Sequence, residues 1–281
     1  MILIDLSQIM MASTMMSMEK GQTEADLDFV RHSVLNSLRM YRTKYTDKYG
    51  ELVICCDDRK SWRREYFPHY KASRKSTRDT SPLNWTQIFE CFDTIKSELK
   101  TTFPYKFIQI EGCEADDVIG VVSRNISGGE KVMIISSDKD FIQLHNKNVQ
   151  QWSPVTKKIV NGEEPNKYLF EHILKGDKSD GIPNVLSDDD SIVNGVRQKP
   201  ITRKYIDNFV MHNAHLNNRT DTEIRNFHRN ENLIDLNKTP KELVDKIWRE
   251  FLQEPEGQRR DLLNFFIEKK LTNLIETIGE F

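Results

Sequence analysis

Short, almost continuously apolar runs alternate along this chain with longer segments in which apolar residues recur at helical spacing. The short runs predict buried strands, at residues 2–6, 52–56, 107–110 and 132–135, with a further short strand at 149–152. The periodic segments predict helices, at residues 24–46, 85–99, 118–126 and 168–174, and the residues after Lys199 are expected to be wholly helical. Strands that alternate with helices are typical of an α/β fold with a mostly parallel sheet.

Acidic residues follow these strands with unusual regularity. Counted at strand or turn ends, they are Asp5, Asp57, Glu114, Asp116, Asp117, Asp138, Asp140, Asp177 and Asp180. In an open α/β sheet, ligands gather outside the carboxyl ends of the strands. Capping of the following helix or turn is the simpler explanation for a single acid such as Asp5, and the two explanations stay equally open there. Capping does not account for three acids within Glu114–Asp117.

Carboxylates gathered at one sheet edge repel each other and stay ionised together most easily when a cation joins them. Oxygen-only ligands favour hard cations such as Mg²⁺ or Mn²⁺ over zinc. Because one ion needs only about three carboxylates, this number of acids predicts two cations about 4 Å apart, as in two-metal hydrolytic sites. No P-loop or EF-hand sequence is present.

The segment from Arg59 to Arg78 has a different composition, because eight of its residues are basic and only Glu65 opposes them. Aromatic residues are interleaved with the basic ones: Trp62, Tyr66, Phe67 and Tyr70. Such a composition favours contacts with phosphates and stacking on bases. A solvated surface loop is the alternative. Residues 72–82 show no apolar periodicity and are expected to be mobile without substrate.

Composition narrows the class of protein further. Of 281 residues, 37% are hydrophobic and 30% charged, and the net charge is -2, which alone neither favours nor excludes nucleic acid. The four cysteines form no C-x-x-C pair, so a zinc or disulfide framework is not expected. The N-terminus lacks the basic start of a signal peptide, and no apolar run approaches the ~18 residues of a membrane span. A cytoplasmic location is therefore expected.

The order of acidic motifs resembles that of the 5′ nuclease superfamily of flap endonucleases and polymerase-linked 5′-to-3′ exonucleases. The resemblance is carried by Asp5, Asp57, Glu114-Ala115-Asp116-Asp117, Ser137-Asp138-Lys139-Asp140 and Gly176-Asp177-x-x-Asp180. Further stretches resemble the T-even bacteriophage ribonuclease H branch of that superfamily, among them Trp62-Arg63-Arg64, Gln151-Trp152-Ser153-Pro154 and Ile173-Leu174-Lys175-Gly176-Asp177. The resemblance extends over nearly the whole chain.

The resemblance implies a mixed, mostly parallel sheet flanked by helices, a helical arch at about residues 60–83, and a duplex-binding turn resembling a helix–turn–helix. The implied domains are an α/β nuclease domain at 1–175 and a helical C-terminal domain at 176–281. The first metal is implied at Asp5, Asp57, Glu114 and Asp116, with Asp117 beside them. The second is implied at Asp138, Asp140, Asp177 and Asp180. Lys71 and Arg64 are the implied basic catalytic residues.

The implied nucleic-acid contacts are Arg63, Arg64, Tyr66, Tyr70 and Lys71 at the base of the arch, Arg74 and Lys75 within it, and Gly181 and Asn184 in the turn. The implied activity is Mg²⁺-dependent removal of RNA primers and adjacent DNA from 5′ ends during lagging-strand synthesis, together with cleavage of 5′ flaps. Mn²⁺ is expected to substitute. The implied substrates are DNA and RNA–DNA hybrids, acted on by a monomer.

A phage single-stranded-DNA-binding protein and a sliding clamp are implied as protein partners. The chain starts only a few residues before Asp5, so if relatives carry an N-terminal peptide for a sliding clamp, this chain is expected to have no room for it. The turn Asp180-Gly181-Ile182-Pro183-Asn184-Val185 departs from the usual Asp-Asn-Ile-Pro-Gly-Val, which puts binding of a monovalent ion in doubt. Two other functions stay open: a non-catalytic fork- or flap-binding protein, and a PIN-like ribonuclease that acts on single-stranded RNA.

Overall fold

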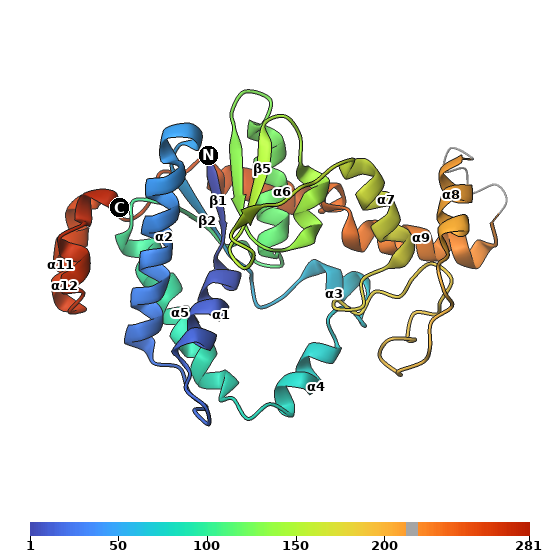
Figure 1. Cartoon of the computed structure of the whole chain (residues 1–281), viewed down its shortest axis with the longest axis horizontal. Coiled ribbons are helices and arrows are strands. Elements are labelled where there is room, and N and C mark those ends of the chain that lie inside the picture. Colours follow the sequence, from blue (N-terminus) through green and yellow to red (C-terminus); the bar gives the residue numbers. More distant parts are fainter. Residues whose placement is uncertain (212–218) are drawn as a thin grey trace.

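One twisted sheet organises the molecule. In the computed structural model, which describes residues 1–211 and 219–281, the strand order is β3-β2-β1-β4-β5-β6 (Figure 1). The strands are β1 (Ile2–Asp5), β2 (Leu52–Cys55), β3 (Lys106–Ile108), β4 (Val132–Ile135), β5 (Val149–Ser153) and β6 (Lys158–Ile159). β1 to β5 pair in parallel, and only β6 runs antiparallel to its neighbour in the described sheet. The predicted mixed, mostly parallel sheet is confirmed.

Alternate side chains of the central strand enter two different apolar layers, as expected for a strand buried on both faces. Ile2 and Ile4 pack with α2 (Leu27–Tyr49) and α5 (Trp85–Thr102). Leu3 packs with α6 (Ala115–Ile126) and α10 (Lys241–Phe251) on the other face. The sheet is thus held between two helical layers, which fixes the edge at which its parallel strands end.

Side-chain caps explain where the long helices begin. The Asp26 carboxylate accepts the backbone N–H groups of Asp28 and Phe29 at the start of α2, and Asn84 accepts that of Gln87 at the start of α5. The sequence pattern did not predict α1 (Leu6–Ser17), which directly follows β1. Its methionines gave no clear helical period, although Met10 is buried in the core.

The basic segment forms two short helices, α3 (Trp62–Tyr66) and α4 (Ser73–Asp79). Figure 1 shows α4 set apart from the sheet, on the chain between α3 and α5. None of the α4 residues is buried, so tertiary packing does not hold this helix. The expectation that residues 72–82 are mobile without substrate stays a prediction.

The C-terminal part is helical, as predicted, within the residues that the structure describes. It contains α8 (Arg203–Met211), α9 (Asp221–Ile234), α10, α11 (Leu262–Glu268) and α12 (Thr272–Ile275), and α7 (Pro165–Lys175) precedes it. Short 3₁₀ turns occur at η1 (Lys139–Leu144), η3 (Leu236–Lys238), η4 (Arg259–Asp261) and η5 (Ile278–Glu280). The expected helix at residues 212–218 lies outside the described residues.

The C-terminal helices share the cores of the sheet. Phe265, Phe266 and Phe281 belong to the same apolar cluster as Ile2 and Ile4. Residues from α10 to the C-terminus therefore complete the packing around the sheet. The division into domains at residues 1–175 and 176–281 stays a prediction.

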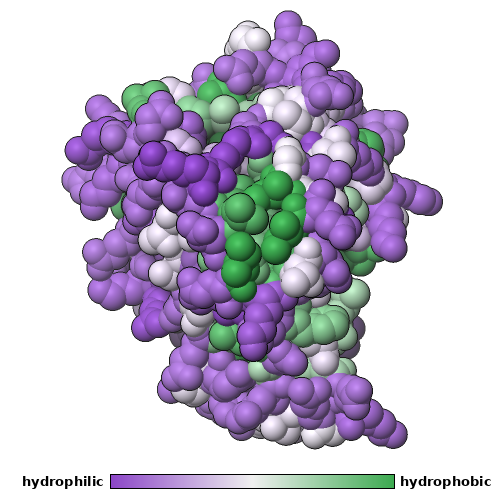
Figure 2. Space-filling view, turned by 90° about the vertical axis from the view of Figure 1, so that its left-hand side faces the viewer, coloured by the Kyte–Doolittle hydropathy of each residue, from purple (hydrophilic) through white to green (hydrophobic). Residues whose placement is uncertain are grey.

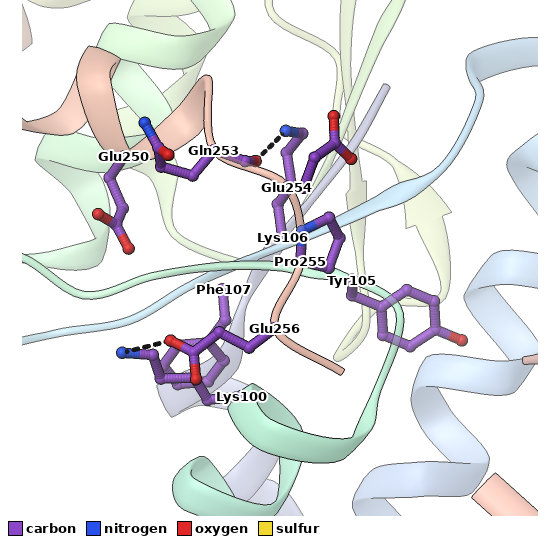
Figure 3. A pocket seen from close by; sticks show the side chains of 9 residues that line it. All are labelled: Lys100, Tyr105, Lys106, Phe107, Glu250, Gln253, Glu254, Pro255 and Glu256. Atoms are coloured by element: carbon purple, nitrogen blue, oxygen red, sulfur yellow. Dashed lines mark hydrogen bonds and ion pairs between the residues drawn. The ribbon is translucent and has the colours of Figure 1, made fainter. Parts of the chain in front are cut away.

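Two surface features lie away from the acidic strand ends. A pocket of about 260 Å³ lies between the end of α5, the start of β3 and the chain after α10 (Figure 3). Lys100 and Glu256 form an ion pair of 3.0 Å across it. Because this pocket adjoins the beginning of β3, it lies at the sheet edge opposite the acids.

An apolar patch surrounded by hydrophilic residues is visible on the side of the molecule where α11 and α12 lie (Figure 2). On α11, Leu263 and Ile267 are exposed apolar residues four positions apart, so both lie on the outward face of that helix. The described residues contain no helix that is long and apolar enough to cross a membrane.

Candidate active site

The ends of three neighbouring strands bring the first acids together. β2, β1 and β4 are adjacent in the sheet, and Asp57, Asp5 and Asp138 end or follow these strands. The Asp57 carboxylate also accepts the backbone N–H of Ala115 at 2.8 Å, which joins the end of β2 to the start of α6. The predicted gathering of carboxylates at the carboxyl edge of the sheet is thus what the fold produces.

Asp5 is buried beneath this edge. Its carboxylate accepts a hydrogen bond from Ser136 Oγ at 3.0 Å and caps α1 by accepting the backbone N–H of Gln8 at 3.3 Å. Burial, and to a lesser extent the negative charge of nearby Asp57, raises the pKa of Asp5 to about 7. Capping and ion binding are therefore compatible roles of the same carboxylate.

Asp116 lies in the first turn of α6 and faces the same group of acids. Burial raises the pKa of Asp116 well above its usual value, Asp138 raises it further, and Lys71 opposes both effects. Carboxylates arranged in this way remain ionised together only if a positive charge joins them. A bound cation would therefore stabilise the ionised form of these acids.

Glu114 holds the basic segment against the acids. Its oxygens accept hydrogen bonds from Lys71 Nζ at 2.7 Å and from Tyr70 Oη at 2.7 Å. Burial opposes ionisation of Glu114, but Lys71 and Arg63 outweigh it and keep its pKa below the usual value. Glu114 is thus occupied by cationic side chains of the chain itself, and its role as a metal ligand stays a prediction.

Asp117 does not fit the metal site in which the sequence placed it. It is fully buried, and its oxygens accept hydrogen bonds from Arg63 at 2.9 Å, Thr239 Oγ1 at 2.9 Å and the backbone N–H of Glu114 at 2.9 Å. Trp62 Nε1 lies 3.3 Å from both oxygens. With no oxygen left to bind an ion, Asp117 serves to anchor α3 and α6.

Arg63 and Tyr70 were predicted to contact nucleic acid, and the structure corrects both assignments. Both side chains are buried, each only 2% exposed. Arg63 donates to Asp117, Glu114 and the backbone carbonyl of Leu233. The Tyr70 hydroxyl contacts Glu114 and lies 3.1 Å from an Asp180 oxygen. The composition of the segment indicated a surface, but these two members of it point into the protein.

A second group of acids lies where η1 meets the end of α7. Asp138 begins η1 and accepts the backbone N–H of Asp140 at 2.9 Å. Between Asp140 and Asp177 lies His172, whose Nδ1 is 3.3 Å from an Asp140 oxygen and whose Nε2 is 3.4 Å from an Asp177 oxygen. Asp140, His172 and Asp177 are close enough together to hold one metal ion.

The charges of this second group depend on one another. Burial is the main cause that raises the pKa of Asp140 to about 7, although His172 opposes it. Burial disfavours the charged form of His172, but the hydrogen bond to Asp177 and the charge of Asp140 outweigh it and raise its pKa. Burial also opposes ionisation of Asp177, yet His172 and Ser179 keep its pKa well below the usual value.

His172 is the residue that the sequence analysis missed. It lies on α7, five positions before Asp177. A histidine in the last turn of a helix that runs into an Asp-containing turn was the available signal. A pattern of carboxylates alone does not indicate this residue.

Asp180 joins the C-terminal turn to the base of the arch. Its carboxylate accepts a hydrogen bond from Arg74 at 2.7 Å and lies 3.6 Å from Lys71 Nζ, while its backbone carbonyl accepts the N–H of Lys71 at 2.7 Å. Gly181 has φ +75°, and a Cβ there would lie 2.7 Å from the His69 carbonyl oxygen. Gly181 is therefore needed for close packing of the two segments.

Asn184 was also predicted to contact nucleic acid, and this assignment is wrong in the structure. The side chain is buried, accepts hydrogen bonds from Leu186 N and Ser187 Oγ, and donates to the Lys199 carbonyl at 2.7 Å. Its hydrogen-bonding capacity is used within the protein. Of the six remaining predicted contacts, Arg64, Tyr66, Arg74 and Lys75 are exposed, whereas Lys71 is half-buried and Gly181 is buried.

The raised pKa of Asp5 predicts how stability depends on pH without metal. The folded protein keeps a proton on Asp5 up to about pH 7, whereas the unfolded chain releases it near pH 4. This contribution is fully present below about pH 4 and is lost as the pH rises through 7. In EDTA, the free energy of unfolding should therefore fall between pH 5 and 7.5, and it should fall less steeply in Asp5→Asn. Equal slopes in chemical denaturation of the two proteins would contradict this prediction.

The chain matches known proteins along its whole length. The family model of the 5′-3′ exonuclease N-terminal resolvase-like domain matches residues 1–170, and that of the T4 RNase H C-terminal domain matches residues 164–281. The ribonuclease H of Enterobacteria phage T4 is 32% identical over 296 aligned residues, which cover 99% of this chain and 95% of that protein. The chain belongs to the 5′-3′ exonuclease family.

A second relative matches about half of this 5′ nuclease, and solved structures share its fold. A 5′-3′ exonuclease of Buchnera aphidicola (subsp. Acyrthosiphon pisum, strain APS) is 32% identical over 151 residues, which cover 50% of each chain. A bacteriophage T5 flap endonuclease, solved as a pseudo-enzyme–product complex with DNA and metal ions, has a TM-score of 0.64 at 20% identity. The match covers 89% of this chain and 97% of that one. The T5 5′-exonuclease with bound zinc has a TM-score of 0.62 at 18% identity, with 90% and 98% covered.

These comparisons confirm the predicted family, fold and enzyme class. The protein is a nuclease whose acidic clusters suit divalent cations. The roles of its individual residues, the identity of the cations and the natural substrate go beyond the comparisons.

Proposed function

We propose that this 5′ nuclease is a Mg²⁺-dependent 5′-to-3′ exonuclease and flap endonuclease. It removes RNA primers and adjacent DNA from 5′ ends during lagging-strand replication. The observation that supports this most is the meeting of two features: carboxylates at the ends of adjacent parallel strands, and a basic segment that Lys71 ties to those carboxylates. A negatively charged polymer bound along the basic segment would place a phosphate beside the acids.

The donor atoms suit two hard cations. Asp5 and Asp116 are acids whose raised pKa values reflect burial and mutual repulsion, which a divalent cation would relieve. The proposed ligands are Asp5, Asp57, Glu114 and Asp116 for one ion, and Asp138, Asp140, Asp177 and Asp180 for the other. When bound, such ions activate a water molecule and stabilise charge on the attacked phosphate and the leaving oxygen. Mn²⁺ is proposed to replace Mg²⁺.

Lys71 is proposed to orient the reacting phosphate. Its backbone adopts φ +52°, which a residue with a side chain rarely adopts. The backbone N–H bonded to the Asp180 carbonyl keeps it in this conformation and directs Nζ to Glu114. Its ammonium is thus held at the edge of the acidic cluster, where it can donate to a phosphate oxygen. Arg64, exposed on α3, is proposed to contact the nucleic-acid strand that carries this phosphate.

The exposed residues Tyr66, Arg74 and Lys75 extend this path along the basic segment. Tyr66 is 47% exposed, and its hydroxyl is fixed by Asn232 Nδ2 at 2.9 Å, so the ring has a defined position for stacking on a base. Arg74 is proposed to exchange its Asp180 partner for a phosphate. Tyr66 ends α3, and Arg74 and Lys75 lie on α4, all within the segment proposed as the arch at about residues 60–83.

Cleavage of a 5′-flap duplex, labelled in turn at its 5′ and 3′ ends, tests the proposal. Products cut from the 5′ end or at the flap junction are expected with Mg²⁺ and none with EDTA. An RNA–DNA hybrid with a 5′ RNA segment should be shortened from the same end. Tight binding without cleavage would instead support a fork-binding protein. Equal activity on single-stranded RNA would support a PIN-like ribonuclease.

Replacement of Arg64 by alanine should weaken binding of the flap duplex. One lost phosphate contact lowers the slope of log Kd against log salt by about one unit. The slope is measured by fluorescence anisotropy in EDTA, so that the DNA stays intact. Arg260→Ala, an exposed arginine on η4 at the other end of the chain, is the matched control and should leave the slope unchanged. An unchanged slope for Arg64→Ala would remove this residue from the phosphate path.

The remaining features of the proposal concern location and partners. We propose that the protein acts as a monomer in the host-cell cytoplasm if it is encoded by a phage. A single-stranded-DNA-binding protein and a sliding clamp are proposed as partners at the replication fork. The proposed domains are residues 1–175 and 176–281, the second presenting its turn at Asp177–Val185 to duplex DNA.

A further inference from the structure

His172 has an unusual environment for a histidine in the last turn of a surface helix. Its side chain is 14% exposed and lies between Asp140 on η1 and Asp177 in the turn after α7. Nδ1 is buried and has no hydrogen-bond partner among the described residues, although an Asp140 oxygen is 3.3 Å away. A buried polar atom without a partner is costly, so this nitrogen is available to bind a ligand.

The two atoms have the separation expected of neighbouring ligands on one ion. In an octahedral site with bonds of about 2.1 Å, adjacent ligand atoms are about 3 Å apart. His172 Nδ1 and the Asp140 oxygen, 3.3 Å apart, come close to that spacing. Nε2 points the other way, toward Asp177 at 3.4 Å. A histidine that binds a metal commonly donates its second ring N–H to a carboxylate in this manner.

The turn between the two residues holds this arrangement. Gly176 ends α7 with φ +65°, and its N–H donates to the His172 carbonyl at 2.8 Å. A Cβ at this glycine would lie 2.4 Å from the Ile182 carbonyl oxygen, so no other residue fits without a shift of the backbone. The Asp177 carboxylate is held in turn by Ser179, whose N–H donates to it at 2.7 Å. Asp177 is thus positioned to orient the imidazole.

We propose that His172 Nδ1 and Asp140 bind one divalent cation directly, while Asp177 accepts the Nε2–H and orients the imidazole without contacting the ion. This refines the second metal position and therefore rests on the proposed function. An imidazole nitrogen among oxygen ligands favours Mn²⁺, Co²⁺ and Zn²⁺ over Mg²⁺. This nuclease should consequently bind transition-metal ions at its second position more tightly than an oxygen-only site would.

Nuclear magnetic resonance of the untagged, full-length protein with ¹⁵N-labelled histidine tests the proposal. Zn²⁺ is added as a diamagnetic probe, and long-range proton–nitrogen spectra are recorded. The His172 Nδ1 resonance should move to the position of a metal-bound nitrogen, while Nε2 stays protonated. His172→Gln assigns the signal by removing it. His228→Gln, an exposed histidine on α9, is the matched control and should leave the response unchanged.

Calorimetric titration gives a second readout. His172→Gln should lower the affinity of the second metal position for Zn²⁺ and Mn²⁺ by roughly 10-fold or more, with a smaller change for Mg²⁺. The proposal would be overturned if the ring ¹⁵N resonances of His172 did not change on addition of Zn²⁺. A Zn²⁺-induced shift of Nε2 instead of Nδ1 would overturn it as well. Either result can occur while the wild-type protein still cleaves flaps with Mg²⁺. Failure of this inference is therefore distinct from failure of the proposed function.

Discussion

Asparagine in place of Asp138 should lower the rate of flap cleavage at least ~10³-fold and leave DNA binding within about threefold of the wild type. Loss of one ligand that positions the reacting phosphate and water costs several kcal/mol of transition-state stabilisation, and each 1.36 kcal/mol is a factor of ten in rate. Because the proposed DNA-binding surface is the basic segment, which lies apart from Asp138 in the chain, affinity should be retained.

The substitution is conservative in structure. Asp138 caps η1 by accepting the backbone N–H of Asp140, and the asparagine side-chain oxygen can do the same. Single-turnover cleavage with Mg²⁺ and anisotropy binding in EDTA measure the two effects separately. Asp188→Asn removes one exposed acid outside the site and should retain full activity. Wild-type turnover by Asp138→Asn would remove this acid from the active site, whereas a melting temperature lowered by many degrees would reveal a loss of folding.

The sheet and its acidic edge were predictable because strand register imposes a simple pattern. β4 begins and ends at the predicted residues, Val132 and Ile135, since a strand buried on both faces is apolar throughout. Parallel strands end at one edge, so acids that follow them must meet there. Asp5, Asp57 and Asp138 needed no knowledge of distant contacts to be placed together.

Side-chain direction could not be predicted in the same way. Arg63 and Arg64 are neighbours in sequence, yet one is buried and the other exposed, because only the position of Arg63 on α3 faces Asp117. Composition describes a segment as a whole and does not distinguish such neighbours. Asn184 was misassigned for a related reason: its partner Lys199 lies fifteen residues away, at the end of a turn whose path the sequence does not define.

Replacement of Arg63 by methionine should destabilise the protein by about 3–5 kcal/mol, the usual cost of leaving a buried charge without its partner. The guanidinium is 2% exposed and supplies the positive charge for Asp117, which is itself fully buried. Methionine fills a similar volume, so the loss reflects charge and hydrogen bonding more than a cavity. Urea denaturation in EDTA gives the free energy of unfolding.

The double variant Arg63→Met with Asp117→Asn shows whether the loss of stability in Arg63→Met comes from the unpaired Asp117 carboxylate or from poorer packing. If the unpaired carboxylate causes the loss, removing its charge should recover part of it, and the double variant should be more stable than the sum of the single changes predicts. Arg64→Met, on the exposed face of α3, should change stability by less than ~0.5 kcal/mol. Strict additivity would show that the two side chains do not interact, and a loss below about 1 kcal/mol in Arg63→Met would show that the pair does not anchor α3. Arg63 also donates to Glu114, a proposed ligand of the first metal, and α3 precedes Lys71 in the chain, so loss of this anchor should also lower cleavage.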